Sequence, residues 1–238
     1  MRTSLPGLKA PDDPMPAAVL SLTVTSGMLD AISFLSLGNV FVGMMTGNVM
    51  VVGFALGGAP HLSDPAPLLA VAGFVAGVAT AGAAFRVAPG CRRWLFSALA
   101  GEISLLAVTT AVAFLAPDSR MGRNACVVLL STTMGIRCAV IRRIGVPELR
   151  ATFAFTGALV ALVHDACAGT GAHASRRFGI IAAMTFGAAV GAATVIQLGL
   201  GWSLLATSLA VAAITFALRL HPHLNRNDSF FGLDGVGS

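Results

Sequence analysis

Charged residues are scarce in this chain. They make up 11% of the 238 residues, whereas a soluble domain has about a quarter. Hydrophobic residues reach 56% and the mean hydropathy is +0.84, so the composition excludes an ordinary soluble domain. The length fits six to eight membrane segments with little left for a soluble part. We therefore predict an all-α fold, a polytopic transmembrane helix bundle.

Lysine is almost absent. Lys9 is the only one, and arginine supplies most of the positive charge behind the formal net charge of +5. Most arginines fall in short segments between apolar runs, which is typical of headgroup anchors and topology signals. No basic stretch is interleaved with aromatic residues, so we predict no nucleic-acid partner. The partner that this composition predicts is the lipid bilayer.

Motifs that carry chemistry are also missing. The 4 cysteines form no CxxC pair, which argues against a zinc site and a disulfide framework. The sequence has no P-loop, no GxGxxG fingerprint and no Ser-His-Asp order in a helpful context. We therefore predict no metal, no cofactor and no enzymatic activity.

Apolar runs divide the chain at residues 17–37, 41–58, 68–88, 94–115, 124–141, 150–166, 178–198 and 202–219. The second, fifth and sixth are shorter than the roughly twenty residues that span a bilayer, so re-entrant hairpins are an alternative to full crossings. We predict one transmembrane domain over residues 17–219, with disordered tails at 1–16 and 220–238. The first run is too long for a cleaved signal peptide.

Polar residues interrupt the first two runs. One helix face of the first run carries Thr23, Ser26, Asp30 and Ser33. Gly38-Asn39 then marks a turn, and Asp30 and Asn48 would each lie about 13 Å below it. A carboxylate at that depth normally faces a protein interior or a watery cavity. The alternative is a helix cross-link without a ligand.

Two charged residues extend this polar layer to later runs. Helical rise puts Glu102 and Arg137 at roughly the depth of Asp30. Because an unpaired charge is costly there, we predict an ion pair between Asp30 and Arg137. The alternative is an Arg137 side chain that snorkels to the interface.

Short echoes indicate an internal repeat. They pair Ser26–Ala31 with Met134–Ala139, Met45–Gly47 with Phe155–Gly157, and Gly73-x3-Gly77 with Gly187-x3-Gly191. Coincidence is the alternative, because each echo is short. A real repeat would relate residues 17–115 to residues 124–219, and an even number of crossings would make the two copies parallel. Both termini would then share one face, which we predict to be cytoplasmic because it holds slightly more basic residues.

Two stretches resemble the signatures of the YoaK family of bacterial membrane proteins. The first is Ser26-Gly27-Met28-Leu29-Asp30-Ala31-Ile32-Ser33-Phe34 with Met45-Thr46-Gly47-Asn48. The second is Ala139–Pro147 with Thr156-Gly157. The resemblance implies a multi-pass protein of the bacterial inner membrane, in a family of unknown function that is sometimes labelled a permease. The family pattern has amides where this chain has Arg137-Cys138.

Three functions fit these features. We favour a secondary transporter or permease for a small solute, coupled to protons through Asp30 or Glu102. A non-catalytic scaffold or sensor, whose polar residues only hold helices together, is the second. An intramembrane enzyme with the two acids as acid and base is the third. A homo-oligomer is compatible with each.

The residues predicted to bind a solute or ion belong to the polar layer or to its repeat: Asp30, Ser26, Ser33, Thr46, Asn48, Glu102, Arg137 and Thr156. The glycines predicted to allow close packing or a local break beside them are Gly27, Gly47, Gly135 and Gly157.

Overall fold

The computed structural model describes residues 15–59, 64–87, 91–144, 155–167 and 174–220. All regular structure within these ranges is helical, which confirms the predicted all-α bundle. The helices are α1 (Met15–Ser36), α2 (Met45–Leu56), α3 (Ala66–Val87), α4 (Cys91–Leu115), α5 (Arg120–Ile144), α7 (Phe155–Cys167) and α8 (Ala174–Leu220). The predicted tails lie almost entirely outside the described residues.

The long helices match the thickness of a bilayer. In the described part of the chain, α3, α4, α5 and α8 are each long and apolar enough to cross a membrane. Gly199 divides α8, because its φ of 78° and ψ of 176° are not helical. We call residues 174–198 the first arm of α8 and residues 200–220 the second arm. The 22 residues of α1 would extend about 33 Å.

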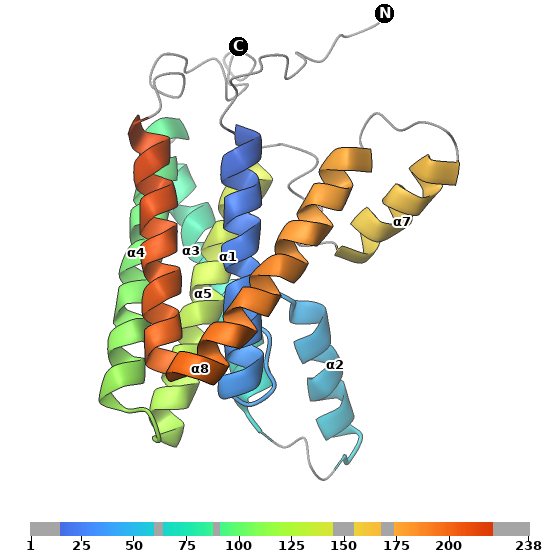
Figure 1. Cartoon of the computed structure of the whole chain (residues 1–238). Helices are drawn as coiled ribbons and strands as arrows, with labels where there is room; N and C mark the ends of the chain where they lie inside the picture. The colour runs from blue at the N-terminus through green and yellow to red at the C-terminus, as the bar shows by residue number, and fades with distance from the viewer. Residues whose placement is uncertain (1–14, 60–63, 88–90, 145–154, 168–173, 221–238) are drawn as a thin grey trace, which may run out of the picture.

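Two helices are too short to cross. α2 has 12 residues and α7 has 13, which gives lengths of about 18–20 Å. α2 begins beside the middle of the bundle and runs to the end where α1 stops, whereas α7 begins near the middle and runs to the other end (Figure 1). The re-entrant alternative for the second and sixth runs is therefore the one that the structure adopts.

The full-length helices alternate in direction (Figure 1). We call the end of the bundle that holds Met15 and Leu220 the terminal face, and the other end the opposite face. α1 descends from the terminal face, α3 rises, α4 descends and α5 rises. The first arm of α8 then descends and the second arm rises. α2 ends on the face where α1 ended, so it adds no crossing. The first half of the chain therefore crosses only through α1, α3 and α4, which is an odd number of crossings.

The two halves of the chain are therefore inverted relative to each other, so the predicted parallel orientation is wrong. α1 runs away from the terminal face, whereas its counterpart α5 runs toward it (Figure 1). The parallel prediction counted the second apolar run as a full crossing. In the structure, α2 ends on the face where α1 ended, so this run adds no crossing. The order within each half is the same: a long helix, a half-length helix and two long helices.

Glycines bring the two halves into close contact. Gly77 of α3 lies against the backbone of α5 at Thr132, and Gly187 of α8 lies against the backbone of α1 at Val24. A Cβ atom at either position would collide with a carbonyl oxygen. Gly27 and Gly135 lie at the same two crossings from the side of α1 and α5. Each half thus packs its third element, which is its second long helix, against the first helix of the other half.

The arginines in helix ends are distributed unequally between the faces. Those at the terminal face are Arg86, Arg92, Arg93, Arg142, Arg143, Arg176, Arg177 and Arg219. Those at the opposite face are Arg120 and Arg123. The sequence-based count placed several of them on the other side, because it assumed a full crossing by the second run. With the observed topology, the excess of arginines at the terminal face is therefore much larger than the excess expected from the sequence.

This topology makes a labelling prediction. Cys167 is exposed at the end of α7 on the terminal face, and Asp118 is exposed in the turn between α4 and α5 on the opposite face. We expect a variant that keeps only Cys167 and a cysteine-free variant carrying Asp118→Cys to react with a membrane-impermeant thiol reagent from opposite sides of the membrane. Labelling of both from the same side would contradict the inverted arrangement.

Candidate functional site

Residues 37–44, which we call the ascending arm, return along α1 without forming a helix. Gly38 and Asn39 have φ values of 99° and 55°, and this left-handed pair reverses the chain after α1. The hydrogen bonds from the backbone of Val42 and Gly43 to Asp30 show that this short arm regains the height that α1 loses between Asp30 and Ser36. The helix predicted from residue 41 begins only at Met45.

The ascending arm has backbone groups that no helix satisfies. At membrane depth such groups need partners inside the protein. Oδ1 of Asp30 accepts hydrogen bonds from the backbone N–H of Val42 at 2.9 Å and of Gly43 at 2.7 Å. Asn48 binds both polar groups of Phe41: its Oδ1 accepts from the N–H at 3.1 Å, and its Nδ2 donates to the carbonyl at 2.5 Å.

The carboxyl group of Asp30 is buried, since only 3% of the residue is exposed. Its Oδ1 is held by the two amides, whereas Oδ2 accepts no hydrogen bond from any residue in the described ranges. Ser33, one turn further along α1, donates its hydroxyl to the backbone carbonyl of Asp30. The carboxyl group thus holds the arm with one oxygen and has the other available.

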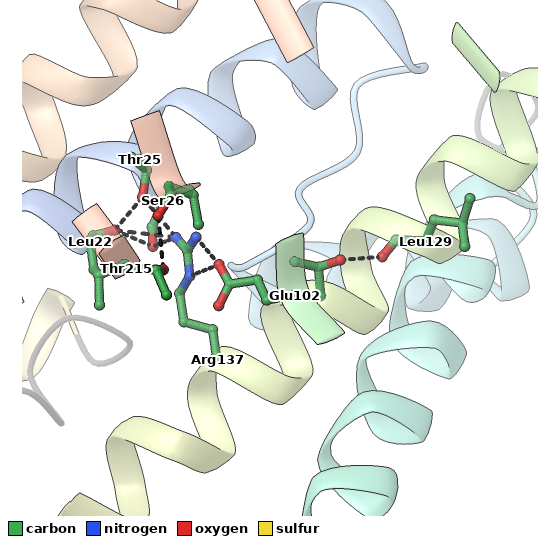
Figure 2. Close-up of polar contacts among 9 residues, drawn as sticks. Leu22, Thr25, Ser26, Glu102, Leu129, Arg137 and Thr215 are labelled. Atoms are coloured by element: carbon green, nitrogen blue, oxygen red, sulfur yellow. Dashed lines mark hydrogen bonds and ion pairs between the residues drawn. The ribbon is translucent and has the colours of Figure 1, made fainter. Parts of the chain in front are cut away.

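A second polar cluster lies one helical turn toward the terminal face. Figure 2 shows Arg137 reaching from α5 toward Glu102 of α4 and toward α1. Its Nε donates to Oε1 of Glu102 at 2.9 Å, and its Nη2 forms an ion pair with the same oxygen. Both side chains are 1% exposed. The pair is therefore fully inside the bundle.

The remaining donors of Arg137 go to α1. Nη1 binds the carbonyl oxygen of Leu22 at 3.2 Å, Oγ1 of Thr25 at 3.0 Å and Oγ of Ser26 at 2.8 Å. The guanidinium group thus joins α5 to α4 and α1 through five contacts. Ser26 and Asp30 lie one turn apart on the same face of α1, which makes the two polar clusters neighbours.

The predicted ion pair between Asp30 and Arg137 is wrong. Arg137 pairs with Glu102, and Asp30 binds backbone amides instead. The snorkelling alternative is also wrong, because the Arg137 side chain is buried. Depth alone put all three residues in one layer, whereas the rotation of α5 decides which acid its arginine meets.

Other predicted site residues divide into buried and exposed groups. Ser33 and Asn48 are buried beside Asp30, and Ser26 is buried in the Arg137 cluster. Thr46, Thr156 and Gly157 are exposed, so they lie outside both clusters. The ring of Phe41 lies 3.3 Å from the position that a Cβ atom on Gly47 would take. The binding roles of all these residues stay predictions.

Sequence reasoning missed Thr25, Val42 and Gly43. Thr25 directly precedes the predicted residue Ser26, and its hydroxyl group is of a kind that can accept a hydrogen bond from an arginine. Gly43 lies between the turn and α2, where a Cβ atom would come within 3.0 Å of Oδ2 of Asp30. Val42 contributes through its backbone, which no side-chain pattern reveals.

Taken together, the fold and the buried charges define a class: a multi-pass membrane protein whose two halves have the same helix order in opposite orientation, with half-length helices and charged residues inside. The chain belongs to the family described as protein of unknown function DUF1275, whose model matches residues 18–218. It is similar to UPF0700 transmembrane protein YoaK of Bacillus subtilis (strain 168), with 31% identity over 147 residues. That match covers 60% of this chain and 64% of the relative. No solved structure matches.

Proposed function

We propose that this protein is a secondary transporter that moves a small solute across the bacterial inner membrane. The observation that carries the proposal is the inverted repeat with one half-length helix in each half. Inverted repeats, broken helices and polar sites near the bilayer midplane are recurrent features of secondary transporters. α2 and α7 begin beside the middle of the bundle and run to opposite faces, which supports this comparison.

Buried charge gives the proposed site its polarity. Asp30, Glu102 and Arg137 are each at most 3% exposed, although charges are rare at membrane depth unless they serve a site or a cross-link. The Glu102–Arg137 pair balances its own charge, which leaves the carboxyl group of Asp30 without an ion-pair partner in the described part of the chain. We assign the binding of a solute or coupling ion to the neighbourhood of Asp30.

The orientation follows from the arginines. A cytoplasmic face carries an excess of arginine and lysine in its short loops. The arginine-rich terminal face supports a placement with both ends of the described bundle on the cytoplasmic side. The proposal includes no catalytic role, because Asp30 and Glu102 have different partners and do not form an acid–base pair.

A scaffold or sensor is the second candidate function. The observation in its favour is the number of contacts of Arg137, whose donors all meet acceptors inside the protein. Asp30 likewise fixes the ascending arm. Polar residues used in this way would stabilise the bundle without any solute.

Transport measurements separate the two candidates. We expect a thermal-shift screen of the detergent-solubilised protein against a metabolite library to yield ligands, since binding at 100 Kd adds about 2.7 kcal/mol. Radiolabelled ligands should then accumulate in sealed proteoliposomes that carry an ion gradient. Ser104→Ala is a control variant that should behave like the wild type, because the exposed Ser104 hydroxyl donates only to the backbone carbonyl of Ala100 in its own helix. Ligands that bind without entering the vesicles would contradict transport and favour the sensor.

A further inference from the structure

The two oxygens of the Asp30 carboxyl group have different surroundings. Oδ1 accepts from Val42 N–H at 2.9 Å and from Gly43 N–H at 2.7 Å. Oδ2 is buried and has no hydrogen-bond partner among the residues that the structure describes. Because the two amides hold Oδ1, the Asp30 carboxyl group can accept a ligand at Oδ2 without first moving.

The neighbours of Oδ2 suit a proton better than a metal ion. A Cβ atom added to Gly43 would lie 3.0 Å from Oδ2 and 2.9 Å from Cε of Met134, so the space beside this oxygen is lined by a glycine backbone and, next to it, a methionine methyl group. Metal cations in proteins need several oxygen ligands. The nearby polar groups are N–H donors, which would repel a cation. No cluster of three metal-binding side chains occurs in the described ranges.

Nearby charges leave the Asp30 carboxyl group without a direct partner. On the elements around this part of α1, the nearest are Arg137 of α5 and Glu102 of α4, which bind each other. The described part of α8 has its charged residues near its ends, at Arg176, Arg177 and Arg219. α2 and the ascending arm have none, and Arg86 lies in the last turn of α3. Asp64 and Arg123 pair with each other beside Gly38.

The ascending arm and α2 form one mechanical unit. Asn48, in the first turn of α2, binds both the N–H and the carbonyl of Phe41 in the arm. The contacts of Val42 and Gly43 with Asp30 are the side-chain hydrogen bonds that join this unit to α1. The rings of Phe34 in α1 and Phe41 in the arm also stack, so weakening the two hydrogen bonds loosens the polar part of the attachment of the arm and α2 to α1.

We propose that Asp30 is the proton-binding site of this protein, and that a proton on its carboxyl group releases the ascending arm and α2 from α1. This deepens the proposed function and rests on it for its role in coupling. Hydrogen bonds to an ionised carboxylate are roughly twice as strong as those to a neutral group. The proton comes from water on one side of the membrane and returns to water on the other. Binding of the proton and movement of the re-entrant hairpin are thereby one event.

Amide hydrogen exchange tests this inference without any solute. We expect the protection factors of the Val42 and Gly43 amides to fall by about tenfold from alkaline to acid pH in the wild-type protein. The Phe41 amide is an internal control, because its acceptor is the Asn48 side chain, which does not titrate. Its protection factor should stay constant.

Two variants complete the test. In Asp30→Asn, protection at Val42 and Gly43 should be low at every pH, because the side chain is permanently neutral. Ser104→Ala removes only an exposed hydroxyl that donates to the backbone carbonyl of Ala100 in its own helix, so it should titrate like the wild type. Protection that is independent of pH in the wild type, or that titrates in Asp30→Asn, would overturn the proton site.

This result and the transport result are separable. A pH-dependent arm in a protein that carries no solute would leave the proton site standing and would contradict the transporter. Solute uptake with a pH-independent arm would support the transporter and overturn the proton site.

Discussion

Replacing Glu102 alone with glutamine is expected to lower the free energy of unfolding in detergent by about 3–5 kcal/mol. Arg137 would remain 1% exposed with its positive charge uncompensated. Arg137→Gln should cost a similar amount, because Glu102 loses its counter-charge and three acceptors on α1 lose their donor. The double variant should recover part of the loss, so that a double-mutant cycle gives a coupling of about 2–3 kcal/mol.

The chain offers a matched control for this cycle. Asp64 and Arg123 form the other described ion pair, with an N–O distance of 3.0 Å and side chains that are 33% and 34% exposed. Solvent screens such a pair, so Asp64→Asn and Arg123→Gln should couple by less than about 1 kcal/mol. Equal coupling in the two cycles would contradict the buried position of the Glu102–Arg137 pair.

The helix crossings should be equally sensitive to added volume. Gly77→Ala and Gly187→Ala each place a methyl group against a backbone carbonyl of the neighbouring long helix, at Thr132 and Val24. We expect each variant to lose about 1–3 kcal/mol of unfolding free energy, because a packed backbone cannot move aside as a flexible side chain does. Because both glycines lie at equivalent crossings of the two halves, we expect the two losses to be similar.

Gly82 provides the control for the glycine variants. It lies in α3 beyond Gly77, and a Cβ atom there would meet nothing within 4 Å. Gly82→Ala should be neutral or slightly stabilising, because alanine favours a helix by about 1 kcal/mol relative to glycine. Unfolding curves in detergent measure all three variants. A loss at Gly82 as large as that at Gly77 would show that the effect comes from helix propensity and not from the crossings.

Composition and run lengths were sufficient to predict the helices. The apolar runs all contain helices, and the kink at Gly199 falls between the last two of them. The orientation of the halves could not be predicted in the same way. Residues 41–44 are as apolar as a helix would be, yet they are not helical, and Asp30 and Asn48 accept hydrogen bonds from their backbone. Hydropathy does not distinguish these two conformations.

Depth along the helices was the useful signal for the candidate site. The depth predicted that Asp30, Glu102 and Arg137 lie near one level inside the bundle, and all three are buried. It did not reveal which acid the arginine meets, because a rotation of one residue about a helix axis changes the facing side by about 100°. Thr46 and Thr156 belong to the same echoed motif as the buried residues, but they face outward on half-length helices.

The short matching segments of the sequence correspond to equivalent contacts in the structure, although the predicted orientation of the two halves was wrong. Gly73 and Gly77 occupy the place in the first half that Gly187 and Gly191 occupy in the second, each against the first helix of the other half. Such mutual packing explains why the glycine spacing recurs. It follows from the contact between halves and is the same for a parallel or an inverted pair, so the sequence alone could not distinguish them.

Proton movement measured together with solute movement tests the account most directly. A pH-sensitive dye would be sealed inside proteoliposomes, and a ligand from the thermal-shift screen would be added outside. The account predicts a change in internal pH that depends on the solute in the wild-type protein. In Asp30→Asn this change should be absent, while labelled solute still exchanges across the membrane. Solute flux in the wild type without any change in internal pH, or an undiminished pH change in Asp30→Asn, would contradict proton-coupled transport through Asp30.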